Sequence, residues 1–135
     1  MQFPRRSGVV LHPTSLPSQF GIGDLVDAAF RLIDFLNDAG QSYWQILPLN
    51  PTGYGDSPYL CFSALAGNPL LISPEKLVEP GYLAPADIAN PPTFPVERID
   101  YGGVIQYKTD LLNRAFANFQ KHADADQQKA FRRFC

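Results

Sequence analysis

The sequence predicts an α/β fold, and two observations support this class. First, a short apolar strand pattern, a helical pattern and a second strand pattern follow one another within residues 7–47. Such a βαβ unit almost always has parallel strands and a right-handed crossover. Second, all 13 prolines lie between Pro4 and Pro95, so the first part of the chain is rich in turns while residues 96–135 are free to be helical.

Local patterns define each element of the βαβ unit. Residues 7–11 are an apolar, β-branched run that ends at His12, which predicts a buried strand. Asp24 is a good N-cap and Gly40 a good C-terminal stop for the helix between them. Residues 42–47, which end before a proline, predict the second strand. The expected apolar face of the helix consists of Leu25, Ala28, Ala29, Leu32, Phe35, Leu36 and Ala39.

The opposite face of this helix carries Asp27, Arg31, Asp34 and Asp38. Carboxylates in pairs also occur in acid–base catalysis, so a chemical role is one interpretation of this pattern. A solvated face with an arginine among its acids is the more common arrangement on a surface helix. We therefore assign these acids no chemistry.

The second half of the chain predicts irregular structure followed by helices. Residues 67–95 mix a short apolar patch with many turn residues, and residues 75–78 suit one helical turn. Asp124 and Gln127 form a capping-box pattern that predicts a last helix. No stop signal follows that helix, so we expect a chain that is cut rather than finished. Residues 104–123 predict a long helix whose apolar face includes Ile105, Leu111, Leu112, Ala115, Phe116 and Phe119.

Composition excludes several classes of function. The chain has 135 residues, which fits one domain, and a formal net charge of −2, which leaves no basic field for nucleic acid or an anionic membrane surface. No apolar run approaches the roughly 20 residues that span a bilayer, and no secretory signal is evident, so we expect a cytoplasmic protein. Two cysteines and two histidines, widely spaced, predict neither a disulfide framework nor a metal site.

The loop after the second strand has a composition suited to ligand binding. In parallel α/β folds ligands bind at the loops after the strand C-termini, here residues 12–23 and 49–59. Three prolines stiffen residues 47–59, and Gly53 and Gly55 allow close approach of the backbone to a ligand. Tyr54 and Tyr59 offer flat faces beside polar groups, which suits sugar recognition. The alternative is an ordered loop whose tyrosines pack into the core.

Four segments in compact order resemble the N-terminal end of the amylomaltase family. They are HPTSLP at 12–17, YWQILPL at 43–49, PTGYGDSPY at 51–59 and GNP at 67–69, with RIDY at 98–101 as a further likeness. These enzymes are the 4-α-glucanotransferases, or disproportionating enzymes, of glycoside hydrolase family 77. The resemblance implies the N-terminal part of a (β/α)8 TIM barrel with an irregular inserted subdomain, truncated. It divides the chain into residues 1–66 with the βαβ unit and sugar-facing loop, 67–103 as the excursion, and 104–135 as the helical part.

The resemblance also implies a substrate and its contacts. Partners would be α-1,4-glucans and maltooligosaccharides, with Tyr59 stacking on the sugar, Ser57 beside the donor chain and Tyr54 on a secondary glucan-binding surface. Asp56 would be structural rather than a nucleophile. Leu60 and Cys61 depart from the polar residues common in the family, and we interpret Cys61 as a small buried residue. We expect Trp44 in the core.

No residue of the chain matches the family's catalytic carboxylates. The implied reaction is retaining transglycosylation, which needs two carboxyl groups roughly 5 to 5.5 Å apart. We therefore expect no catalytic residue, no metal and no cofactor in this chain, and a fragment that is inactive alone. Two alternatives remain open at this point: an α-amylase-type glucan hydrolase and a non-catalytic glucan-binding module.

Overall fold

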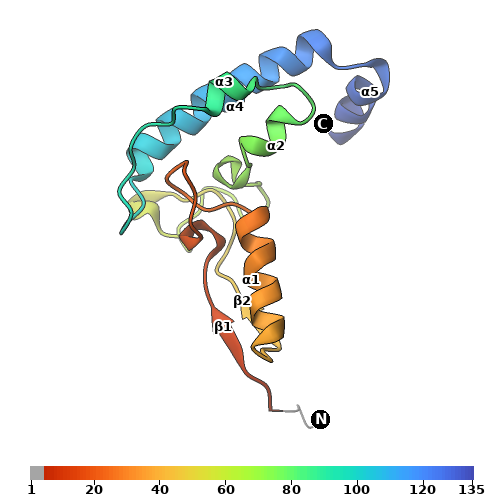
Figure 1. Cartoon of the computed structure of the whole chain (residues 1–135). Helices are drawn as coiled ribbons and strands as arrows, with labels where there is room; N and C mark the ends of the chain where they lie inside the picture. The colour runs from red at the N-terminus through yellow and green to blue at the C-terminus, as the bar shows by residue number, and fades with distance from the viewer. Residues whose placement is uncertain (1–4) are drawn as a thin grey trace.

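The computed structural model describes residues 5–135. Figure 1 shows β1, α1 and β2 together at the N-terminal end, with α4 crossing the opposite end and α5 folded back beside it. In chain order the elements are β1 (Gly8–Val10), the 3-10 helix η1 (Pro13–Ser15), α1 (Asp27–Asp38), β2 (Tyr43–Gln45), the 3-10 helices η2 (Tyr54–Asp56) and η3 (Pro69–Leu71), α2 (Glu75–Val78), α3 (Pro85–Ile88), α4 (Tyr101–His122) and α5 (Ala125–Phe134).

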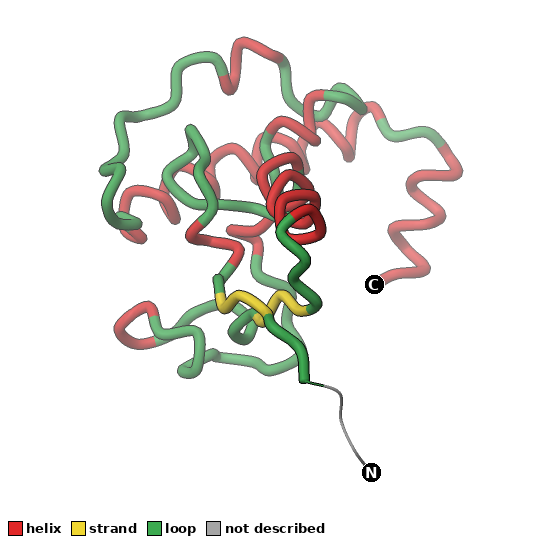
Figure 2. The backbone as a smooth tube through the Cα atoms, turned by 60° about the horizontal axis from the view of Figure 1, so that its bottom comes forward, coloured by secondary structure: helices red, strands yellow, loops and turns green. Residues whose placement is uncertain are grey.

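The two strands are parallel, which confirms the βαβ prediction. Gly8 pairs with Tyr43 and Val10 with Gln45, and Figure 2 shows the two short strands side by side. A Cβ at Gly8 would lie 2.5 Å from the carbonyl oxygen of Tyr43, so the close approach of the strands requires glycine there. The prediction that β1 is buried was wrong, since Val10 is 61% exposed. Within the described residues the sheet has only these two strands, so one edge of β1 has no paired strand.

Helix α1 begins later than the sequence predicted. Its first residue is Asp27, and the N-cap is Val26, without a side-chain hydrogen bond. Asp24 is not the cap, because it is buried at 6% exposure in the preceding loop. The predicted stop is confirmed: Gly40 has φ of +67°, and the next amide, that of Gln41, donates to the Leu36 carbonyl at 2.8 Å.

The apolar face of α1 is narrower than its sequence pattern. Ala29 and Leu36 are buried, whereas Phe35, which the spacing places on the same face, is 65% exposed, and Leu25 is also exposed. The four charged residues of the opposite face are exposed, as predicted for a solvated surface. Only a few small and medium-sized side chains of α1 are therefore buried.

Helix α4 organises the core. It starts at Tyr101, three residues before the predicted start, because Asp100 caps it by accepting a hydrogen bond from the amide of Gly103 at 3.3 Å. Val104 packs in a cluster with Ile22 and Leu70, while a second cluster consists of Leu83, Leu111 and Ala115. Ile105 and Phe116 of the predicted apolar face are instead partly exposed.

The remaining helices follow their sequence signals. Helix α2 has the predicted bounds, and α5 has the predicted capping box, in which Gln127 N donates to Asp124 Oδ1 at 2.8 Å and Asp124 N to Gln127 Oε1 at 3.0 Å. Phe131 of α5 packs against Phe119 of α4 with ring centroids 5.3 Å apart. Residues 67–95, for which the sequence predicts irregular structure, hold only η3, α2 and α3.

Candidate functional site: a loop with exposed tyrosines after β2

The loops that follow β1 and β2 are fastened to each other. His12 Nε2 lies 3.2 Å from the carbonyl oxygen of Pro48, and Trp44 Nε1 donates to the Leu11 carbonyl at 2.8 Å. A carbonyl can only accept, so the His12 proton lies on Nε2, and Nδ1 accepts from the Thr14 hydroxyl at 2.7 Å. Because parallel strands end on the same side, these contacts hold both loops at one edge of the sheet. Trp44 is half-buried there and bonds to backbone.

We define residues 50–68 as the tyrosine loop. Asn50 closes its base, because the Asn50 side-chain amide donates to the carbonyls of Ala64 at 2.8 Å and Ala66 at 3.2 Å. Higher in the loop an isolated antiparallel bridge pairs Thr52 with Cys61. The loop is therefore a closed structure whose two limbs are joined at two levels.

The predicted binding residues lie at the outer end of this loop. Tyr54 is 89% exposed and Tyr59 is 68% exposed, so the alternative in which the tyrosines pack into the core is wrong for this chain. Ser57 is half-buried, and its hydroxyl accepts a hydrogen bond from the Tyr59 amide at 3.3 Å. The loop thus presents two aromatic side chains and one hydroxyl to solvent from a stretch of six residues, as sugar binding requires.

The turn between the two tyrosines has a restricted backbone. Gly55 has φ of +68°, and Asp56 has φ of 54°, the left-handed region that Asp tolerates better than most residues. The Asp56 side chain is exposed, while the local hydrogen bond to a backbone amide is made by Ser57. Cys61 is a free, half-buried cysteine rather than a fully buried one.

The pKa of Tyr101, at the start of α4, is influenced by burial and by one residue from each of the two loops. Burial raises the pKa of its phenol above the usual value, the Thr14 side chain opposes that rise, and the negative charge of Asp56 adds to it. Sequence reasoning noticed Tyr101 only as part of the RIDY likeness. Asp100, a cap residue directly before a helical pattern, was the signal that could have placed it at a helix start.

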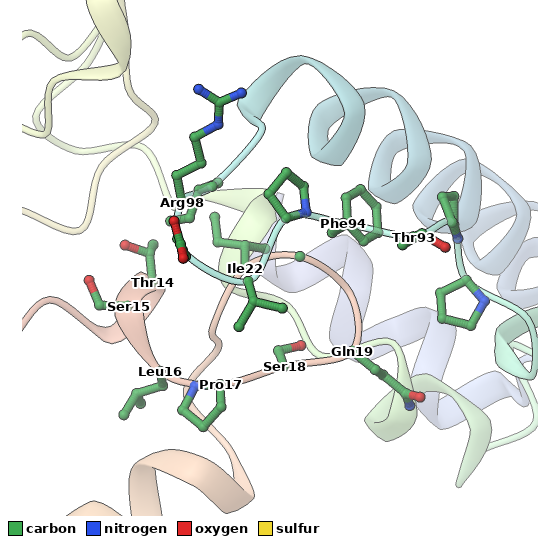
Figure 3. Close-up of a pocket in the computed structure, with 17 residues that line it drawn as sticks. Thr14, Ser15, Leu16, Pro17, Ser18, Gln19, Ile22, Thr93, Phe94 and Arg98 are labelled. Atoms are coloured by element: carbon green, nitrogen blue, oxygen red, sulfur yellow. The ribbon is translucent and has the colours of Figure 1, made fainter.

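The predicted loop after β1 lines a cavity of about 670 Å³. Figure 3 shows Thr14 and Ser15 on one side of this cavity and Thr93 and Phe94 on the other. Several polar groups here are already engaged: Ser18 Oγ accepts from the Phe20 amide, and Gln19 donates to Glu75. Tyr54, Ser57 and Tyr59 do not line the cavity. Of the two predicted binding loops, only the loop after β1 therefore lines this cavity. Residues 91–99, which form another part of its lining, were not predicted as part of a site.

A buried lysine was also missed by the sequence reasoning. Lys108 of α4 is 0% exposed, and its ammonium donates to the Leu70 carbonyl at 2.6 Å. Burial lowers the pKa of Lys108 to about 8, and the carboxylate of Asp24 partly opposes that effect. The signal in the sequence was its position in the apolar stripe between Val104 and Leu111.

The described part of the chain has neither a metal-binding cluster nor a membrane-spanning helix. Among residues 5–135, no three side chains of the metal-binding types gather into a cluster that could hold an ion. In the same residues no helix combines the length and the apolar character needed to cross a membrane.

Comparisons with known proteins find close relatives along almost the whole chain. The glycoside hydrolase 77 family model, described as 4-alpha-glucanotransferase, matches residues 11–135. The chain is 56% identical over 131 residues to a 4-alpha-glucanotransferase from Synechocystis sp. and 48% identical over 134 residues to one from Thermus thermophilus. These matches cover 97% and 99% of this chain but 26% of each relative.

A solved structure gives the same result for the fold. An amylomaltase from Streptococcus agalactiae, in complex with acarbose, matches with a TM-score of 0.89 at 39% identity. The match covers 97% of this chain and 26% of the amylomaltase chain. The chain therefore has the fold of the corresponding region of that enzyme and spans about a quarter of the length of the relatives it matches.

Proposed function

Because the chain belongs to the 4-alpha-glucanotransferase family, we propose that it forms the sugar-facing N-terminal part of an enzyme that transfers a segment of an α-1,4-glucan. The acceptor is the 4-hydroxyl of glucose or of a maltodextrin. The match of the family model to residues 11–135 carries this proposal. The exposed tyrosines of the tyrosine loop support it independently, since they offer the surface that a sugar ring needs.

Three residues of the tyrosine loop bind the substrate in this proposal. Tyr59 stacks on a sugar ring near the cleavage point, and the Ser57 hydroxyl lies beside the donor chain. Tyr54 holds a more distant part of a long glucan. The exposure of both aromatic rings supports these roles, and the hydrogen bond from the Tyr59 amide to Ser57 supports a fixed relation between Ser57 and Tyr59.

The chemical step belongs to the rest of the enzyme. In a retaining mechanism one carboxylate forms the glycosyl-enzyme and a second carboxyl group acts as acid and then as base. Neither is assigned to this chain, so the chain by itself binds glucan and does not cleave it. A complete (β/α)8 barrel, which typically needs about 250 residues, supplies both groups at its C-terminal face. Transfer in place of hydrolysis then requires that an acceptor sugar, rather than water, meets the glycosyl-enzyme.

The proposal includes the cellular setting and the ligands. The substrates are α-1,4-glucans and maltooligosaccharides in the cytoplasm, and neither nucleic acid nor a membrane is a partner. The net charge of −2 supports the exclusion of polyanions.

A product assay tests the function. The full-length protein that carries this segment is incubated with maltotriose, and the products are separated by chromatography. We expect glucose together with maltodextrins longer than maltotriose. Release of short sugars only would contradict transfer and support the alternative of a glucan hydrolase. The 135-residue chain alone is the control, and it should produce neither pattern.

A further inference from the structure

Lys108 interrupts an otherwise apolar stripe of α4. Val104 lies four residues before it and Leu111 three residues after it, and both are buried. An uncompensated ammonium in such a place is costly, and an apolar residue of similar volume is often at least as stable there. Local conflicts of this kind concentrate at functional positions.

Among residues 5–135, the ammonium makes one direct hydrogen bond, which leads to η3. Lys108 Nζ donates to the carbonyl of Leu70, a central residue of that short helix, at 2.6 Å. A hydrogen bond with one charged partner is roughly twice as strong as a neutral one. The ammonium thereby fixes η3 against the middle of α4, where Leu70 also packs on Val104.

From η3 the hydrogen bonds continue to the tyrosine loop. The Leu70 amide donates to Asn68 Oδ1 at 2.9 Å, and Asn68 Nδ2 donates to the Asn50 carbonyl at 3.3 Å. Asn50 is the residue whose own amide closes the loop onto Ala64 and Ala66. An unbroken series of contacts thus runs from the centre of α4 to the base of the loop that carries Tyr54 and Tyr59.

We infer that Lys108 is a positioning residue, which acts through Asn68 and Asn50 to hold the tyrosine loop in its sugar-binding orientation. Its effect on catalysis rests on the proposed function of that loop. Lys108 contacts no substrate. The charge matters because it strengthens the hydrogen bond to Leu70, which fixes the α4 end of this series of hydrogen bonds. The apolar stem of the lysine fills the core as any aliphatic side chain would.

The first test replaces the ammonium and keeps the stem. Lys108→Met in the full-length protein should leave folding intact and lower kcat/KM for maltooligosaccharides about tenfold, mostly through KM, because displacement of a binding group by 1 Å can cost roughly 100-fold. Lys76→Met is the matched control, since Lys76 is an exposed lysine of the neighbouring α2, paired with Glu79, and should change neither constant. A folded Lys108→Met protein with kcat/KM within twofold of the wild type overturns the inference.

The second test breaks the series at its middle. Asn68→Asp keeps the oxygen that accepts from Leu70 but removes the donor to Asn50, and it leaves Lys108 in place. It should raise KM as Lys108→Met does, and the double variant should be little worse than either single one, because residues that act as a unit are not additive. Additive effects would mean that the two residues act separately and would overturn the inference. If Lys108→Met does not fold, an unchanged KM in Asn68→Asp still overturns the inference, because Lys108 acts through Asn68.

A third measurement separates this inference from the proposed function. Amide hydrogen exchange of residues 50–66 in the full-length protein, without any sugar, should become faster in Lys108→Met and Asn68→Asp and stay unchanged in Lys76→Met. An enzyme without transfer activity that still shows this pattern refutes the proposed function alone. Unchanged exchange in both variants refutes the positioning role, whatever the activity.

Discussion

The tyrosine loop and helix α4 are built on opposite plans. The loop exposes its large side chains and holds its backbone through the amides of Asn50 and Asn68. Helix α4 buries Val104 and Leu111 against the rest of the chain and has one buried cation, Lys108. Hydrogen bonds therefore maintain the binding surface, and apolar burial maintains the scaffold behind it. Apart from Lys108, which links the two regions, substitutions in the loop and in α4 should accordingly separate binding from stability.

The largest expected effect is on the scaffold. Leu111→Ala removes a buried side chain that packs with Leu83 and Ala115, and it should lower the free energy of unfolding by about 2–5 kcal/mol. Urea unfolding of the full-length protein, followed by circular dichroism, measures this loss. Ile105→Ala on the same helix is the control, because Ile105 is partly exposed and should cost clearly less. Equal losses from the two variants would contradict the division of α4 into a buried and an exposed face.

The buried lysine makes the stability of this scaffold depend on pH. Lys108 has a pKa of about 8 in the folded protein and 10.5 without its surroundings. Between these values the unfolded chain binds more protons than the folded one, so the free energy of unfolding rises with pH. The full rise is about 3 kcal/mol, because each pKa unit corresponds to roughly 1.36 kcal/mol. Urea unfolding of the wild type at a series of pH values measures it.

Lys108→Met isolates the lysine's share of that pH dependence. The variant should lack the rise. The free energy of unfolding of the wild type should therefore increase relative to that of the variant between pH 8 and pH 10. Tyr101 and Tyr107 act in the opposite direction at higher pH, because burial raises the pKa of each phenol and the unfolded chain then loses its protons first. Parallel curves for the two proteins would mean that Lys108 is charged and well solvated.

Sequence reasoning predicted the parts of this molecule that depend on local chemistry. The βαβ order, the stop at Gly40 and the Asp124 capping box follow from short-range patterns, and the structure has each of them. It failed where distant segments decide the outcome. Asp24 looked like a helix cap, but it is buried in a loop near Lys108, more than 80 residues away in sequence. No local pattern reports that proximity.

The same distinction applies to the candidate site. The residue types of the tyrosine loop predicted an exposed aromatic surface, and Tyr54 and Tyr59 are exposed. The hydrogen bonds that hold the loop were not predictable from the sequence. They join Asn50 with Ala64 and Asn68 with Asn50, which lie 14 and 18 positions apart. Asparagine in a loop usually indicates only a turn. Which backbone groups it meets depends on the closed path of the whole loop.

The next prediction concerns binding without stability. Tyr59→Ala should lower kcat/KM for maltotriose at least about tenfold, a loss of roughly 1.4 kcal/mol, because the sugar loses its stacking partner. The free energy of unfolding should change by less than about 0.5 kcal/mol, since the side chain is mostly exposed. Tyr59→Phe keeps the flat face and should retain most of the activity. A Tyr59→Ala protein that unfolds more easily but binds normally would reverse the roles of loop and scaffold.

The smallest effect should depend on substrate length. Tyr54 and Tyr59 lie in one loop but differ in their proposed contacts, so Tyr54→Ala should raise KM about threefold to fivefold for long α-1,4-glucans, which corresponds to roughly 0.7–1 kcal/mol. It should leave KM for maltotriose unchanged, because a short sugar cannot reach a second surface while it occupies the first. Steady-state kinetics with maltotriose and with amylose measure both values. Two binding sites on one protein increase the affinity together only for a ligand that is long enough to reach both. An equal increase in KM for maltotriose and amylose in Tyr54→Ala would therefore place the two tyrosines at a single sugar site.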